Sequence, residues 1–235
     1  PLQFPDDGDC HPCYLLSPMS IANKNKMDQW GLPDTIPIFP LSGALLMPRT
    51  QLPLNIFEPR YLEMIKDAKE NGGWVGMVQP KNEKDKPETY DIGCLGRIGE
   101  FNETEDGRFL ITLVGVMRFK IREELDVDTK YRQVIPDFKP FGADQAVSPD
   151  LSFEKRQALL DDLKRYLDHI GFRIDWDEVE AANDEAIVNA LAILAPFEAA
   201  EKQALLEAAT LLERTEIAQA LLQFALLDQD KPLAH

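Results

Sequence analysis

The residues best suited to catalysis are few and widely separated in this sequence of 235 residues. No serine lies in a G-x-S-x-G turn, which would expose its hydroxyl as a nucleophile. The histidines lie near the termini or at the end of a predicted helix, which disfavours a Ser-His-Asp arrangement. There is no G-x-x-x-x-G-K-[ST] phosphate-binding loop and no H-E-x-x-H zinc motif. The sequence therefore predicts no catalytic residue and no cofactor; the residues considered were Ser17, Ser20, Ser42, Ser148, Ser152, His11, His169 and His235.

The cysteines provide the only short metal-type pattern, Cys10-His11-Pro12-Cys13. Two thiolates and a histidine this close in sequence do not make a ready four-ligand zinc site, and the strand–helix context of a redox C-x-x-C is missing. We expect no metal here and expect the third cysteine, Cys94, to be a small core residue. Three cysteines also fit a reducing compartment without a disulfide framework.

Two further groups of residues have a possible functional interpretation. Glu58 and Arg60 resemble an acid–base pair, but a carboxylate at a helix N-terminus beside an arginine is more simply a structural ion pair. The apolar run Leu45-Leu46-Met47-Pro48 is bounded by prolines and includes a methionine, which can serve as an adaptable contact surface. Burial in the core is the alternative for this run. Together with Trp74, these four residues are the candidate polypeptide contacts.

The net charge of −16 disfavours binding to nucleic acid or to anionic membranes, because both require a basic face. The charge is uneven: residues 141–235 hold 8 Lys+Arg and 19 Asp+Glu, a balance of −11. This acidic half consists either of solvated helix faces or of a docking face for a basic partner. No run of about 18 apolar residues and no secretory signal occurs, so we expect a cytoplasmic protein.

Residues 35–140 alternate short apolar strands with turns. Four prolines between positions 37 and 53 exclude a continuous helix, and a helix is predicted from Pro59 to about residue 70. Glycines within the later strands predict bends around a small barrel. The fold class is therefore α+β, with a bent, mostly antiparallel β pseudo-barrel and a predicted core of Phe39, Leu54, Phe57, Tyr61, Ile65, Val78, Ile111, Leu113 and Phe119.

The two ends of the chain differ from this pattern. Residues 1–34 are rich in proline and polar residues, which indicates an N-terminal tail. Residues 140–149 are predicted as a linker. Residues 150–230 then show a 3.6-residue apolar period, with Gly171 ending one helix and Asn183 beginning another, so they predict an α-helical bundle.

The stretch 37–65, PIFPLSGALLMPRTQLPLNIFEPRYLEMI, resembles the opening of the Lon protease amino-terminal domain. The matching features are Phe39-Pro40-Leu41, Pro48, Leu52-Pro53-Leu54 and Ile56 to Tyr61. Residues 201–222 resemble the helical part that follows in the same family, so the resemblance covers roughly residues 35–227. It implies a PUA-like pseudo-barrel and a role in binding protease substrates. The ATPase and Ser–Lys peptidase modules of full Lon proteases are absent from this sequence.

These observations predict a stand-alone, non-catalytic module that binds unfolded or partly unfolded polypeptides, with a separate ATP-dependent protease as a further candidate partner. A peptidase acting through an unrecognised site is one alternative. RNA binding is another, because PUA-like domains often bind RNA. It would require Arg97, Arg108, Arg118, Lys120 and Arg122 to gather on one face.

Overall fold

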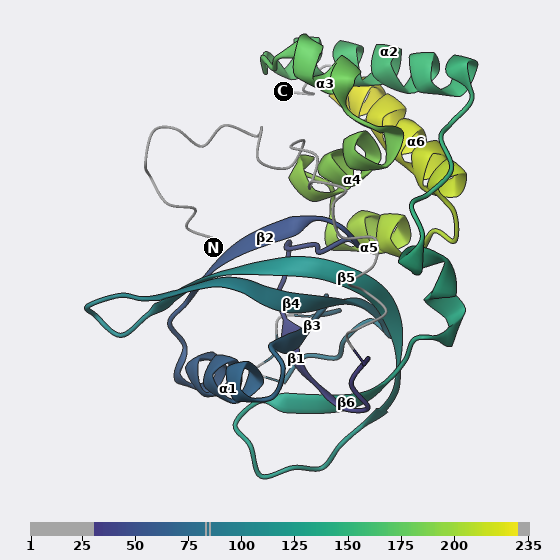
Figure 1. Cartoon of the computed structure of the whole chain (residues 1–235). Helices are drawn as coiled ribbons and strands as arrows, with labels where there is room; N and C mark the ends of the chain where they lie inside the picture. Colours follow the sequence, from purple (N-terminus) through teal and green to yellow (C-terminus); the bar gives the residue numbers. More distant parts are fainter. Residues whose placement is uncertain (1–30, 83, 85, 230–235) are drawn as a thin grey trace. The chain divides into compact units, whose positions relative to one another are not determined.

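The computed structural model describes residues 31–82, 84 and 86–229 (Figure 1). The chain divides into two compact units between Val147 and Ser148. The first is built mainly of strands and the second of helices, as the change in sequence period predicts. Residues 1–30 of the predicted tail, which include the Cys10/Cys13 pair, lie outside the described residues.

Six strands form one mixed sheet in the first unit, in the order β2-β5-β4-β3-β1-β6. Because β6 also pairs with β5, the sheet curls back on itself without forming a regular barrel. The β1–β3 pair is parallel and the other pairs are antiparallel, so the expected mostly antiparallel arrangement is confirmed. The strands are β1 (Ile36–Pro40), β2 (Gln51–Ile56), β3 (Trp74–Val78), β4 (Ile92–Glu103), β5 (Phe109–Glu124) and β6 (Arg132–Asp137).

The long strand β5 pairs with both of the strands that end the strand order, β2 and β6. Its first part pairs with β2 and β4, and its end pairs with β6. The pairing shifts register at three places, between Leu95 and Gly96, between Ile98 and Glu100, and between Ile121 and Glu123. Such irregularities increase local twist and bend the strand. These bends explain how β5 can pair with β2 and β4 along its first part and with β6 at its end.

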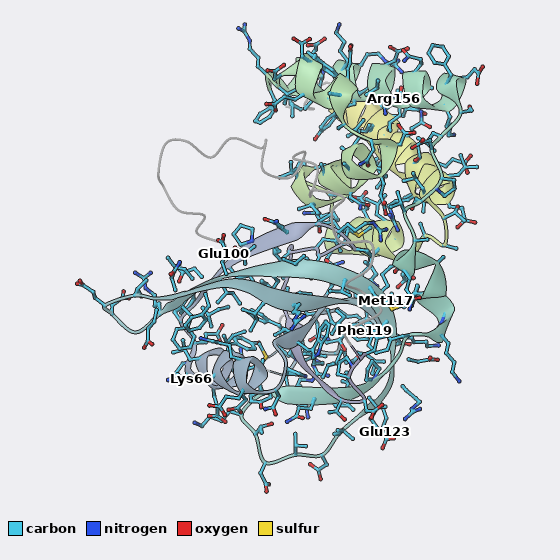
Figure 2. The ribbon with its side chains drawn as sticks, viewed as in Figure 1. Lys66, Glu100, Met117, Phe119, Glu123 and Arg156 are labelled. Atoms are coloured by element: carbon cyan, nitrogen blue, oxygen red, sulfur yellow. The ribbon has the colours of Figure 1, made fainter. Side chains whose placement is uncertain are left out.

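Helix α1 (Pro59–Glu70) begins with proline at its first position and ends before Asn71, Gly72 and Gly73, as predicted. Its buried residues are Tyr61, Met64, Ile65 and Ala68, the same stripe that the sequence period indicates. Inside the sheet, the core gathers around Met117 and Phe119 of β5, which Figure 2 labels. All predicted core residues are buried except Phe57, which is 63% exposed.

The prediction for Phe57 is wrong for a positional reason. This residue follows the last residue of β2 and precedes Glu58, the N-cap of α1. Along β2 the buried side chains are Leu52, Leu54 and Ile56. Phe57 therefore continues the outward-facing set of the alternation rather than the buried one.

The segment predicted as a linker is partly ordered against the sheet. Residues Lys139–Gln145 form the 3-10 helix η3, which packs on β5. Phe141 and Asp144 are buried in it. The first unit therefore extends past the predicted boundary at residue 140.

The second unit contains five helices among the described residues: α2 (Phe153–Ile170), α3 (Trp176–Ala181), α4 (Asp184–Leu194), α5 (Ala199–Glu207) and α6 (Leu211–Gln229). Gly171 ends α2 in the left-handed conformation, with φ of 70°. The side chain of Asn183 accepts a hydrogen bond from the N–H of Ala186 at the start of α4, so both predicted helix boundaries are confirmed. Helix α6 packs against α2, α4 and α5.

Candidate functional site

The loop that leads into β2 is held by a tight turn. The N–H of Thr50 donates to the carbonyl of Met47 at 3.1 Å, with Pro48 and Arg49 between them. Arg49 has φ of 66°, a conformation that residues other than glycine adopt rarely. Proline followed by a residue with positive φ is the pattern of a type II turn. The Thr50 hydroxyl fixes the turn further, by donating to the Met47 carbonyl at 2.8 Å.

This turn continues directly into a β-bulge opposite Gly115. The N–H of Arg49 donates to the Gly115 carbonyl, and the N–H of Gly115 donates to the Thr50 carbonyl, each at 2.8 Å. Two residues thus face one, with the first in the left-handed region, as in a G1 bulge. A Cβ atom on Gly115 would lie 2.0 Å from the carbonyl oxygen of Met47, so the close approach requires glycine.

The candidate contact residues from the sequence lie inside the first unit. Leu45, Leu46 and Met47 are each at most 2% exposed, Trp74 is 8% exposed, and Pro48 is buried. The interpretation of this run as an exposed contact surface is therefore wrong, and the alternative of burial agrees with the structure. The run fills the core and orients the turn at Arg49. A polypeptide cannot reach these five side chains in this conformation.

A buried ion pair lies next to the turn. The Arg118 guanidinium donates to both carboxylate oxygens of Asp144, from Nη2 at 2.7 Å and from Nε at 2.9 Å. The Arg118 backbone N–H donates to the same carboxylate at 3.0 Å, and Arg49 Nη1 donates to the Asp144 backbone carbonyl at 2.5 Å. These contacts attach η3 to β5 and to the turn. Burial raises the pKa of the nearby Cys94 thiol, and the Asp144 carboxylate raises it further, so this cysteine is an inert core residue.

Glu58 and Arg60 form a surface ion pair, as the structural interpretation predicts. Arg60 Nη2 lies 2.8 Å from Glu58 Oε2, and the guanidinium also stacks over the Tyr61 ring, 4.7 Å from its centroid. Both side chains of the pair are 43% exposed. The arrangement fixes the entry into α1 and leaves no acid–base pair facing a cavity.

A cavity of about 210 Å³ opens between α1 and the β4–β5 hairpin. Lys69 Nζ lies 3.3 Å from the centroid of Phe101, and Lys66 Nζ lies 5.4 Å from that of Phe109. The ammonium groups therefore cover the ring faces that an apolar ligand would need. The volume is also below the 300–1,000 Å³ or so of small-molecule sites. The cavity is lined by Lys66, Lys69, Glu70, Phe101, Glu103 and Phe109.

The clearest accessible apolar feature of the first unit lies at β2. This strand pairs only with β5 among the described residues, so no described strand pairs with its other edge, which we call its open edge. Asn55 lies opposite Leu110, which is 42% exposed. Residues 55 and 57 lie on the same side of the strand, so Phe57 and Leu110 share one face of the sheet. We call Phe57, Leu110 and the open edge of β2 the edge patch.

Three of the five basic residues considered for RNA binding contact neighbouring side chains. Arg118 is buried against Asp144, and Arg108 pairs with Asp106 at 2.7 Å. Arg97 stacks on Trp74, with its guanidinium 5.3 Å from the ring centroid. These three cations already interact with other side chains, and Arg118 is buried. No group of three or more potential metal-ligating side chains occurs in the described parts of the chain.

Comparisons with known proteins identify the family. Residues 35–223 match the family model of the ATP-dependent protease La (LON) substrate-binding domain. The chain is 30% identical over 121 residues to a Lon protease of Flavobacterium johnsoniae, a match covering 50% of this chain and 14% of that protein. It is 24% identical over 183 residues to Lon protease 1 of Bdellovibrio bacteriovorus, covering 76% of this chain and 23% of that protein. The chain belongs to the LON substrate-binding domain family. The matched part of the chain spans less than a quarter of the length of these relatives.

Solved structures support the same fold. The Lon N-terminal domain protein of Xanthomonas campestris aligns with a TM-score of 0.60 at 20% identity, over 79% of this chain and 97% of that chain. The N-terminal domain of the Mycobacterium avium complex Lon protease aligns with a TM-score of 0.58 at 14% identity, over 80% and 98%. These alignments confirm the predicted fold class, and the match to the family model confirms the predicted family. None of the described helices has both the length and the apolar composition needed to cross a membrane.

Proposed function

We propose that this chain is a non-catalytic module that binds unfolded or partly unfolded polypeptides, and that it presents them in the cytoplasm to a separate ATP-dependent protease. The main support for this proposal is the match of residues 35–223 to the family model of the LON substrate-binding domain. The sequence contains neither a phosphate-binding loop nor a G-x-S-x-G serine motif. We therefore propose binding, and not catalysis, as the activity of this chain.

The edge patch is the proposed binding surface. In an antiparallel pair, successive residues alternate between bonding the partner strand and directing their N–H and C=O groups away from it. Counting from the bulge opposite Gly115, the outward groups belong to Gln51, Pro53 and Asn55. An extended polypeptide can pair with such an edge through backbone hydrogen bonds, which do not depend on its sequence.

Two properties of the edge patch suit weak, general binding. Pro53 supplies no N–H, so the edge offers fewer bonds than a regular strand and is protected from uncontrolled pairing. Phe57 and Leu110 provide apolar contact area for side chains of an unfolded chain. A short edge with two anchors predicts a dissociation constant in the micromolar range or weaker.

The experiment is a fluorescence anisotropy titration of the protein into a labelled, permanently unfolded chain such as reduced casein, without nucleotide. The double variant Phe57→Asp/Leu110→Asp should weaken binding by about tenfold or more, because it places charge on both anchors. The matched control is Val127→Asp, an exposed apolar residue of the same unit at 37% exposure, and it should bind as the unaltered protein does.

Two results would contradict different parts of the proposal, the binding function and the binding surface. If the unaltered protein shows no binding up to high micromolar concentration, the polypeptide-binding function fails. If binding occurs but the double variant and the Val127 control behave alike, the function stands and the edge patch is the wrong surface. Circular dichroism and melting temperature of each variant establish that the fold is intact.

A further inference from the structure

The helical unit carries a second apolar surface, separate from the edge patch. Near its end, helix α6 contains the run Ala220-Leu221-Leu222-Gln223-Phe224-Ala225-Leu226-Leu227, which is apolar except at Gln223. A helix that is apolar all round is normally covered all round. Here Leu222 is fully buried, whereas Phe224 is 61% exposed and Leu227 is 68% exposed.

The end of α2 adds two more apolar side chains at the same end of the unit. Lys155 pairs with Glu216, and further along both helices Asp162 accepts hydrogen bonds from Gln219 and Gln223. Helices α2 and α6 therefore run in parallel, with residue 162 level with about residue 221. At 1.5 Å per residue in both helices, the end of α2 is level with the end of α6.

The exposed large apolar residues at these two helix ends are Ile170 at 44%, Phe172 at 49%, Phe224 and Leu227. We call them the helix-end patch. Phe172 is held in place because its N–H donates to the Leu167 carbonyl at 2.9 Å, just beyond the left-handed Gly171. Contiguous exposed apolar surface marks interaction sites more often than scattered apolar residues do.

The charges next to the helix-end patch indicate the kind of partner. From residue 168 to residue 180, the chain that leaves α2 and forms α3 carries five exposed carboxylates and one arginine, Arg173. Residues 141–235 as a whole have a balance of −11. A second copy of the same chain would bring equal negative charge to the contact, which disfavours self-association. The carboxylates are Asp168, Asp175, Asp177, Glu178 and Glu180.

We propose that the helix-end patch docks a basic amphipathic helix of another protein. The apolar stripe of such a helix would cover Phe224, Leu227 and the end of α2, and its lysines and arginines would face the carboxylates around α3. This site is independent of the proposed polypeptide-binding function. It gives the acidic half of the chain a folded partner in addition to the unfolded chains expected at the edge patch.

The test uses three synthetic peptides of about 18 residues, titrated into the full chain by isothermal calorimetry. The first has a leucine stripe at helical spacing with lysine elsewhere. The second keeps the stripe and replaces lysine by glutamate. The third has the composition of the first in scrambled order. The first peptide should bind about tenfold more tightly than either of the others, and its affinity should fall as salt is raised.

Matched variants locate the contact. Phe224→Ser/Leu227→Ser should weaken binding of the first peptide by about tenfold or more. The control Phe153→Ser/Leu212→Ser changes residues of the same types, 73% and 49% exposed, at the opposite ends of α2 and α6, and should leave binding unchanged. Both pairs are exposed, so the helical content of each variant should match that of the unaltered protein.

Several results would overturn the proposal. It fails if no peptide binds, if the glutamate peptide binds as well as the lysine peptide, or if both variant pairs weaken binding equally. A dimer in light scattering that Phe224→Ser/Leu227→Ser dissociates would make a second copy the occupant instead. Casein binding by the Phe57→Asp/Leu110→Asp variant is measured separately, so failure at one surface is distinguishable from failure at the other.

Discussion

The Asp144 carboxylate accepts two hydrogen bonds from the Arg118 guanidinium, at 2.7 and 2.9 Å, and the two side chains are only 7% and 3% exposed. The residues are 26 positions apart, one on β5 and one on η3. The pair therefore joins the end of the first unit to its longest strand. The bond from Arg49 to the Asp144 backbone carbonyl links the same point to the turn before β2.

Removal of one partner should be much more costly than removal of both. Asp144→Ala leaves a buried guanidinium uncompensated and should lower the free energy of unfolding by about 3–5 kcal/mol. Arg118→Met/Asp144→Leu removes both charges and should recover most of that loss. Urea unfolding followed by circular dichroism measures both variants. Equal destabilisation by the single and the double variant would contradict the buried-charge account.

The β-bulge opposite Gly115 provides the second prediction. Gly115→Ala should lower the free energy of unfolding by about 3 kcal/mol or more, because the added Cβ would lie 2.0 Å from the Met47 carbonyl oxygen. The control is Gly142→Ala, where no atom lies within 4 Å of the added carbon and the change should stay within about 0.5 kcal/mol. Similar unfolding midpoints for the two variants would show that the turn relaxes more easily than the geometry implies.

The third prediction separates Phe57 from the true core. Phe57→Ala should change the free energy of unfolding by no more than about 0.5 kcal/mol, since the side chain is 63% exposed. Phe119→Ala should cost about 3–5 kcal/mol, because that ring is fully buried. Denaturant titration of both variants measures the difference. A large loss on truncation of Phe57 would mean that another part of the protein covers it in solution.

An element could be predicted from the sequence when the residues that determine it lie close together along the chain. Helix α1 could be predicted because its buried stripe, its proline start and its glycine end are all local. The partnership of Arg118 with Asp144 could not, because no local pattern connects residues 26 positions apart. Residues 140–149 are likewise predicted as a linker from the sequence, although part of this segment lies in η3, where Phe141 and Asp144 are buried.

The same limitation applies to the candidate site. An apolar run such as Leu45 to Met47 looks the same in sequence whether it is buried or presented at the surface. The strand period was the signal that could have placed Phe57 correctly. Leu52, Leu54 and Ile56 occupy the inward positions of β2, which leaves position 57 on the outward side. Applied to β2, that alternation would have placed residue 57 at the surface.

The fourth prediction concerns alkaline pH. The Tyr131 hydroxyl donates to Asp67 Oδ2 at 2.7 Å, which ties the start of β6 to α1. Burial raises the pKa of Tyr131 above its usual range, and the hydrogen bond to Asp67 raises it further. Because the pKa in the folded state lies above the unfolded value of about 10, this group stabilises the fold fully below that pH. The stabilisation is lost as the pH rises above about 10.

Tyr131→Phe should therefore lower the free energy of unfolding by about 1 kcal/mol at neutral pH, through loss of the hydrogen bond. It should also flatten the decline in stability above about pH 10, because the variant has no hydroxyl to ionise at this position. Urea unfolding at a series of pH values measures both effects, and absorbance near 295 nm follows tyrosine ionisation. In the unaltered protein, Tyr131 should ionise only as the fold is lost. An identical alkaline decline in the variant would show that Tyr131 is not the group that couples unfolding to high pH.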